Sequence, residues 1–160
     1  MYASSSGGGS ISTLESAVLG LMALMIGFTF AMALSRFEAR RDAILNEANA
    51  IGTTALRARL LPQPERGEVL KLLREYVAIR LDITRRKTSR AELAAAVDRS
   101  NVLQEALWLH ATALSAKDPG MVPTGLFIQT LNDMIDQQGK RLGALRNRVP
   151  NSVMLALFGI

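Results

Sequence analysis

The sequence predicts an all-α membrane protein, in which one N-terminal transmembrane helix continues into a cytoplasmic helical bundle and a second transmembrane helix starts at the C-terminus. Three observations predict this fold. The nineteen residues from Ser16 to Leu34 contain no charge, proline, asparagine or glutamine. Apolar residues then recur with helical spacing through a charged segment between Arg36 and Arg148. The last eight residues, 153–160, are again uncharged.

Composition separates this chain into apolar ends and a charged middle. All nineteen Lys and Arg and thirteen of the fourteen acidic residues lie between Arg36 and Arg148, which gives that segment a net charge of +6. The absence of cysteine excludes disulfides and thiolate chemistry. One Trp, two Tyr and five Phe are too few for a base-stacking surface, so no nucleic-acid partner is predicted. The basic pI indicates instead attraction to the anionic headgroups of a lipid bilayer.

The N-terminal residues divide into a tail and a membrane span. Residues 1–11 are rich in serine and glycine and are predicted to be a disordered tail. Ser12 and Glu15 have the spacing of a capping box, so the transmembrane helix is predicted over residues 12–35. Its uncharged part spans roughly 28 Å, close to the hydrocarbon thickness of a bilayer. No basic residue precedes it, which argues against a cleaved signal peptide.

Small residues recur at every fourth position along the predicted span. They form one stripe: Ala23, Gly27, Ala31 and Ser35. Such stripes allow close helix–helix contact in lipid, within one chain or between copies. The alternative interpretation is that small residues are simply common in membrane helices, and the sequence leaves both open.

Basic residues predict the orientation of the span. Arg36, Arg40 and Arg41 follow it immediately, whereas the N-terminal tail has no Lys or Arg. The positive-inside rule therefore predicts a cytoplasmic (inner) membrane protein with its N-terminus outside. Arg146 and Arg148 are a second membrane-proximal basic pair, just before the terminal apolar stretch.

Residues 36–150 are predicted to form a cytoplasmic four-helix bundle whose first helix is continuous with the transmembrane helix. In that first helix apolar residues recur every seven positions: Phe37, Ile44, Ile51 and Ala58. Pro62 and Pro64 end it. The second helix begins at Pro64 and carries a heptad seam: Val69, Leu72, Tyr76, Ile79 and Ile83. Leu73 and Val77 widen this seam into a face suited to a bundle core.

Turn and capping signals separate the remaining helices. Ser89 and Glu92 form a second capping box, from which a third helix is predicted to about Ser115. Residues 117–122 are predicted to form a turn. A fourth helix follows from Pro123 to Pro150, with a predicted inward face: Phe127, Leu131, Met134, Ile135, Leu142 and Leu145. Residues 151–160 are too short to cross a bilayer, so they are expected to be the start of a second transmembrane helix in a truncated chain.

A set of polar residues in the bundle helices is the candidate functional site. It comprises Glu47, Asn49, Asn132, Asp133 and Asp136. One interpretation is a structural network of hydrogen bonds and ion pairs, with Arg57, Arg74 or Arg80 as partners. The other is an ion-coordinating or gating site near the membrane face, and the sequence leaves this alternative open.

Signatures of catalysis are missing from the sequence. His110 is the only histidine, and it falls at a heptad-like position that predicts a packing role. The glycines form no phosphate-binding pattern. The sequence therefore predicts no catalytic residues, no cofactor and no metal site, and an enzyme ranks last among the functional classes.

Five short motifs occur in order along the chain: EANAIG from Glu47, LLPQPER from Leu60, REYV from Arg74, LNDMID from Leu131 and RVP from Arg148. With them the chain resembles the bestrophin-like domain family of bacterial integral membrane proteins, over about residues 15–160. The resemblance implies a charged helical domain between an N-terminal span and a C-terminal pair of spans. The present sequence departs from this pattern because it ends within the first span of that pair.

Two functional hypotheses follow. The first is an integral membrane protein of the bestrophin-like kind that forms part of an oligomeric ion-conducting or transport-related assembly, which would make the chain a homo-oligomer. The family name implies kinship with anion channels, but this is an analogy of fold that assigns no residue a role. The second is a membrane-anchored helical scaffold or signalling module without transport activity.

Overall fold

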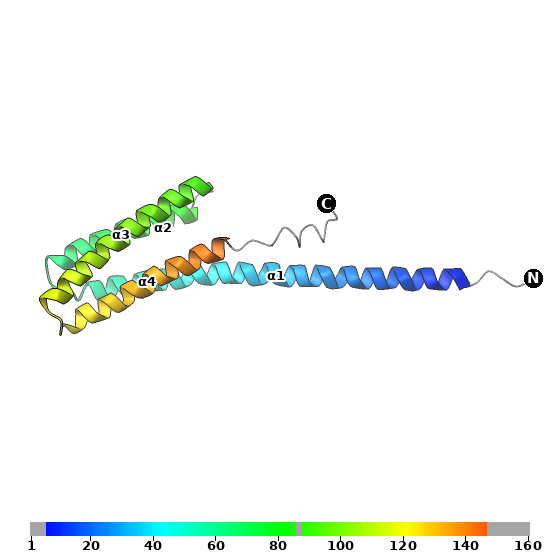
Figure 1. The fold of residues 1–160 in the computed structure, drawn as a ribbon, viewed down its shortest axis with the longest axis horizontal. Coiled ribbons are helices and arrows are strands. Elements are labelled where there is room, and N and C mark those ends of the chain that lie inside the picture. The colour runs from blue at the N-terminus through cyan, green and yellow to red at the C-terminus, as the bar shows by residue number, and fades with distance from the viewer. Residues whose placement is uncertain (1–5, 86–87, 147–160) are drawn as a thin grey trace, which may run out of the picture. The chain divides into compact units, whose positions relative to one another are not determined.

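The computed structural model describes residues 6–85 and 88–146, and side chains within residues 11–145 of those ranges. These ranges contain four helices and no strand, which confirms the all-α prediction (Figure 1). The helices are α1 (Ser6–Ala58), α2 (Glu65–Arg85), α3 (Arg90–Lys117) and α4 (Val122–Arg146). The chain divides into two compact units, and the larger unit is Asp42–Gly143. The predicted second span, residues 151–160, lies outside the described residues.

The start of α1 corrects the predicted tail. Residues 6–11 are helical, so the helix begins six residues earlier than expected and Ser12 lies inside it, not at its N-cap. The carbonyl of Ser12 accepts a bond from Ser16 Oγ at 2.9 Å, as a helix-interior residue does. Extending a helix that is already nucleated costs little per residue, and this allows even a Ser/Gly stretch to continue it.

The apolar stretch of α1 is exposed along its length. Within the described residues, α1 is the one helix long and apolar enough to cross a membrane, and none of its apolar window is buried. Large side chains such as Leu19, Phe28 and Phe30 are all exposed. The hydroxyl of Thr29 donates to the carbonyl of Met25 at 2.8 Å, so this polar group is satisfied within the helix.

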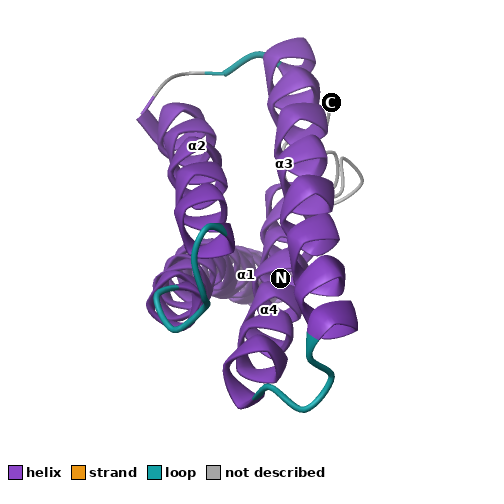
Figure 2. Ribbon diagram, turned by 90° about the vertical axis from the view of Figure 1, so that its left-hand side faces the viewer, coloured by secondary structure: helices purple, strands orange, loops and turns teal. Residues whose placement is uncertain are grey.

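The unit Asp42–Gly143 packs four helical segments around one core. Figure 2 shows α2 and α3 side by side, and the loop after α3 joins its lower end to the neighbouring end of α4. The core draws residues from every helix: Ala58, Leu61, Val69, Leu73, Tyr76, Leu107, Ala111, Leu114, Phe127, Leu131 and Met134. Burial of these side chains is the main source of stability, at about 1.5–3 kcal/mol for each large one.

The local signals that separate the bundle helices are confirmed. Ser89 is the N-cap of α3: its hydroxyl accepts from Glu92 N at 3.2 Å, and the Glu92 carboxylate accepts from Ser89 N at 2.7 Å. The predicted turn between α3 and α4 is held by Gly120 N, which donates to Asp118 Oδ1 at 3.1 Å. On α4, Phe127, Leu131 and Met134 are buried as predicted.

The buried faces of α1 and α2 differ from the predicted seams. Phe37 is 67% exposed and Ile44 is also exposed, so the first two residues of the sevenfold repeat in α1 lie outside the core. The residues of α2 that are buried are Val69, Leu73, Tyr76 and Arg80. The prediction for α2 is therefore right at Val69, Leu73 and Tyr76. The buried residue that it did not include is Arg80, because an apolar pattern does not reveal a buried charge.

Candidate functional site

Three charged side chains are buried in the described part of the bundle, and they lie together. Glu47 of α1 is 1% exposed, Arg80 of α2 is 4% exposed and Arg141 of α4 is 6% exposed. Three helices therefore each contribute one charge to the interior. Charged residues are rarely buried unless they are paired, so this cluster is the most distinctive feature of the core.

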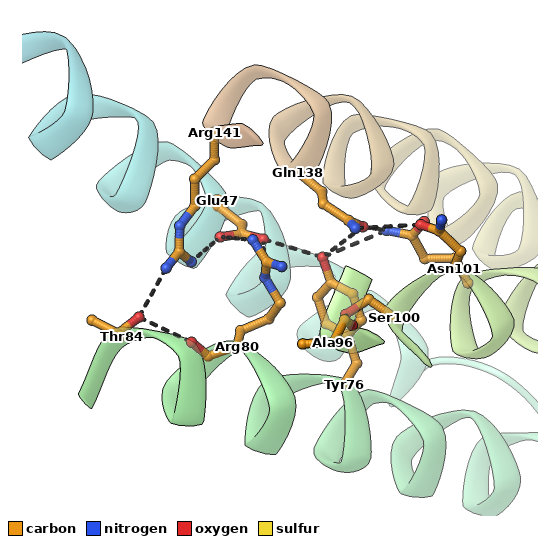
Figure 3. Close-up of polar contacts among 10 residues, drawn as sticks. Glu47, Tyr76, Arg80, Thr84, Ala96, Ser100, Asn101, Gln138 and Arg141 are labelled. Atoms are coloured by element: carbon orange, nitrogen blue, oxygen red, sulfur yellow. Dashed lines mark hydrogen bonds and ion pairs between the residues drawn. The ribbon is translucent and has the colours of Figure 1, made fainter. Parts of the chain in front are cut away.

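The carboxylate of Glu47 lies between the two guanidinium groups (Figure 3). Arg80 Nε is 2.7 Å from Glu47 Oε1, and Arg80 Nη2 donates to Glu47 Oε2 at 3.3 Å. Arg141 Nη1 donates to the same Oε2 atom. Arg141 Nη2 donates to the hydroxyl of Thr84 at 2.8 Å, which in turn donates to the carbonyl of Arg80 at 2.9 Å. We call Glu47, Arg80 and Arg141 the buried ion cluster.

Polar side chains extend the buried ion cluster to α3. The hydroxyl of Tyr76 lies 3.2 Å from Glu47 Oε1 and 3.3 Å from Gln138 Oε1. Gln104 Nε2 of α3 donates to Gln138 Oε1, and Gln138 Nε2 lies 3.4 Å from Asn101 Oδ1. All four helices are therefore joined by one chain of polar contacts through the interior (Figure 3).

The electrostatics of the cluster are unbalanced. Two guanidinium groups face one carboxylate, which gives a buried net charge of +1. Arg80 Nη1 and Arg141 Nε are buried and have no hydrogen-bond partner among the described residues. The Arg80 guanidinium also lies 6.0 Å from the ring centroid of Tyr76, in range of a cation–π contact. The stability of the buried ion cluster therefore depends strongly on Glu47, because that carboxylate is the only negative charge in the cluster.

The ionisation of Tyr76 is shifted by the same surroundings. Burial raises the pKa of its hydroxyl, and the nearby Glu47 carboxylate raises it further, while Arg80 opposes the shift. The hydroxyl therefore stays protonated and remains a hydrogen-bond donor over the physiological pH range.

The burial of its five members corrects the predicted polar network. Only Glu47 is buried, and its pairing with Arg80 was one of the expected alternatives. Arg57 instead donates to the carbonyl of Leu126 at 2.8 Å. The other four members are exposed: Asn49, Asn132, Asp133 and Asp136. They occupy the outer faces of α1 and α4, because successive helix positions are about 100° apart and their neighbours fill the core.

Asn132 nonetheless lines a surface hollow. The hollow has a volume of about 360 Å³ and lies between α3 and α4. Its walls include Gln104 and Asn101 of the buried polar chain, together with Trp108, which is partly buried against the core. The polar chain thus reaches from the buried ion cluster to the protein surface at this hollow.

The small-residue stripe lies along the candidate span. Ala23, Gly27, Ala31 and Ser35 are exposed, and a Cβ added at Gly27 would meet nothing within 4 Å, so a helix–helix contact there stays a prediction.

The basic residues after the candidate span differ in their surroundings. Arg36 is partly buried, Arg41 is exposed, and Arg40 Nε donates to the carbonyl of Ala144 at 3.3 Å. The side chain of Arg146 and the whole of Arg148 lie outside the described residues.

Six residues of the polar chain are absent from the predicted network: Tyr76, Thr84, Asn101, Gln104, Gln138 and Arg141. A signal for two of them exists in the sequence. Gln138 and Arg141 continue the spacing of Leu131 and Met134 along the buried face of α4, in steps of three and four residues. Polar residues at positions that the periodicity assigns to the core therefore mark this site.

In the residues that the structure describes, fold and site together define an all-helical protein with one candidate membrane-spanning helix and an ion cluster inside its bundle. The sequence model of the Bestrophin-like domain matches residues 11–160. The chain therefore belongs to the bestrophin-like domain family, which confirms the resemblance seen in its motifs. Neither the curated proteins nor the solved structures contain a match to the chain.

Proposed function

We propose that this protein is part of an oligomeric ion-conducting or transport-related assembly in the cytoplasmic membrane, with α1 as a transmembrane helix. The observation that carries the proposal is the apolar part of α1, none of which is buried, in a chain of the bestrophin-like family. Each large apolar side chain of that stretch would gain about 1.5–3 kcal/mol by leaving water. A lipid bilayer is the environment that supplies this gain along a whole helix.

The charge pattern supports a cytoplasmic location for the unit Asp42–Gly143. Arg36, Arg40 and Arg41 follow the apolar stretch, and no Lys or Arg precedes it. Loops on the cytoplasmic side carry an excess of basic residues, so the N-terminus is assigned to the outside. A reporter fused after Arg41 is expected to be active only inside the cell, and activity outside would refute this orientation.

The transport proposal is tested by ion flux into liposomes that contain the purified chain. Flux that exceeds empty liposomes and changes with Asp136→Asn supports conduction. Asp136 is exposed, so its substitution alters charge without disturbing the core. Glu75→Gln, which removes a carboxylate at an exposed position of α2 outside the candidate network, is the matched control. Absence of flux from correctly inserted, folded protein would refute the proposal.

A second candidate function is a membrane-anchored scaffold without transport. The burial of Glu47 favours it, because a carboxylate that is 1% exposed and held by two arginines is closed to a passing ion. Under this hypothesis the buried ion cluster only fixes the packing of the helices. A scaffold would bind a protein partner and give no flux in the same liposomes.

A further inference from the structure

The outward face of α3 carries a second heptad pattern. Its positions alternate in steps of four and three residues: Ala95, Arg99, Val102, Ala106, Leu109, Ala113 and Ala116. We call these residues the outer seam. All are exposed except Ala106, which is partly buried, and the two largest apolar side chains, Val102 and Leu109, are 69% and 60% exposed.

The outer seam is separate from the face of α3 that packs into its own bundle, except at its start, where Ala95 and Arg99 line a hollow shared with Asp82 of α2. That inner face consists of Ala96, Ser100, Gln104, Leu107, Ala111 and Leu114. A helix at a protein surface normally has one apolar stripe and an opposite polar face. The α3 helix instead has two apolar stripes, and six of the seven outer-seam residues are uncharged and apolar. Exposed apolar surface of this kind marks an interaction site.

The spacing of the outer-seam residues indicates that the partner is another α-helix. Apolar residues that repeat every 3.5 positions match another α-helix through knobs-into-holes packing. Four alanines in the outer seam leave room for a close approach of the two backbones. We propose that the outer seam of α3 pairs with the same seam of a second copy of this chain, in parallel and in register. This inference rests on the proposed oligomeric assembly and names one of its contacts.

Charge complementarity supports pairing with an identical, parallel helix. Arg99 is the one charged residue of the outer seam, and Asp98 is adjacent to it. In a parallel, in-register pair Arg99 lies opposite Arg99 of the second copy. Each of these two arginines is also beside Asp98 of the other copy, which offsets their repulsion. A single charged residue within a seam is a known means of fixing register. Glu105 on one flank would likewise face His110 of the second copy on the other flank.

An antiparallel pair fits these charges less well. The outer seam is centred between residues 105 and 106, so reversal of one helix places Glu105 beside Glu105 of the second copy. Like charges directly opposed are unfavourable. Copies that insert in one membrane with the same orientation are related by rotation about the membrane normal. Such a rotation preserves the component of each helix axis along the membrane normal, so it cannot make an antiparallel pair from helices that run along the normal. Confinement to one membrane also raises the effective concentration of the two seams.

The test uses the absence of cysteine in this chain. Val102→Cys and Leu109→Cys are each introduced alone into the full chain, and isolated membranes are oxidised. In a parallel, in-register pair each new thiol faces its own equivalent, so both variants are expected to form disulfide-linked dimers. Ala78→Cys, at an exposed position of α2, is the matched control and is expected to give at least about tenfold less dimer. Equal cross-linking at all three positions would overturn the proposal.

Charge exchange tests the register. Arg99→Asp, added to the Val102→Cys variant, is expected to reduce dimer yield several-fold, because the introduced carboxylate would then face Asp98 of the second copy. The combined exchange Asp98→Arg with Arg99→Asp is expected to restore it. Dimers that form only when the Val102→Cys and Leu109→Cys proteins are mixed would indicate antiparallel packing and overturn the parallel pair.

The mass of the protein in detergent distinguishes a failure of the seam contact from a failure of the proposed oligomeric assembly. An oligomer without cross-links at the outer seam would overturn the seam contact alone and leave the proposed assembly intact. A monomer without flux would refute both. Dimers specific to positions 102 and 109, together with an oligomeric mass, are the result expected.

Discussion

The dependence of the bundle on Glu47 is the most direct test of its interior. Glu47→Gln keeps the size of the side chain but removes the only negative charge of the buried ion cluster. Arg80 and Arg141 are then left with two buried positive charges and no counter-charge. Loss of one partner from a buried ion pair costs about 3–5 kcal/mol. For a unit of about 100 residues, 1 kcal/mol corresponds to about 4 °C in Tm, so Tm should fall by about 12–20 °C.

The comparison with Arg141→Met makes this prediction specific to charge. That variant also removes contacts to Glu47 and Thr84, but it leaves one carboxylate facing one guanidinium, a neutral pair. Its expected cost is about 1–3 kcal/mol, the range for lost buried hydrogen bonds. Asn49→Ala, at an exposed position of the same helix as Glu47, should change stability by no more than about 0.5 kcal/mol.

Thermal unfolding of the full chain in detergent, followed by circular dichroism, gives the measurement. The native protein and Asn49→Ala are expected to share the highest Tm. Arg141→Met is expected to have a lower Tm, and Glu47→Gln the lowest. If Arg141→Met were more damaging than Glu47→Gln, the account of an excess buried positive charge would be wrong. A Glu47→Gln protein within about 2 °C of native would mean that the carboxylate has no structural role.

Three further outcomes follow from the bundle. Ser89→Ala removes the N-cap of α3 and should cost about 1 kcal/mol, visible as a shift of about 4 °C in Tm, whereas Ser89→Asp should retain most of the stability. Phe127→Ala opens a cavity in the core and should cost about 3–5 kcal/mol in chemical denaturation; a loss below about 1 kcal/mol would contradict its full burial. In a Tyr2→Phe variant, Tyr76 is the sole tyrosine, and its raised pKa means that stability is full below about pH 10 and declines as pH rises above it. Absorbance at 295 nm should therefore change together with loss of helical signal, and ionisation of Tyr76 in the folded protein would refute this.

The sequence predicted most of the helical architecture because its signals are local. The Ser89 cap, the turn before α4 and the apolar face at Phe127, Leu131 and Met134 all arise from residues close together in the chain. The start of α1 was misplaced, since a Ser/Gly stretch has low helix propensity, yet it prolongs a helix that already exists.

The candidate site was harder to predict because its partners are distant in the chain. Glu47 was identified, and Arg80 was among its expected partners, but Arg141 was not. Residues 47 and 141 come together only after four helices have packed, and no local pattern encodes that contact. The exposed acids Asp133 and Asp136 were included because they are one helical turn apart, although the apolar spacing of α4 places both outside its core face.

Trp108, which lines the hollow between α3 and α4, is the only tryptophan in the protein. Its fluorescence consequently arises from one place, where two bundle helices meet, and the apolar stretch of α1 contributes none. A spectroscopist can thus follow this junction by intrinsic emission in micelles or vesicles, without an attached dye and without interference from the apolar stretch of α1.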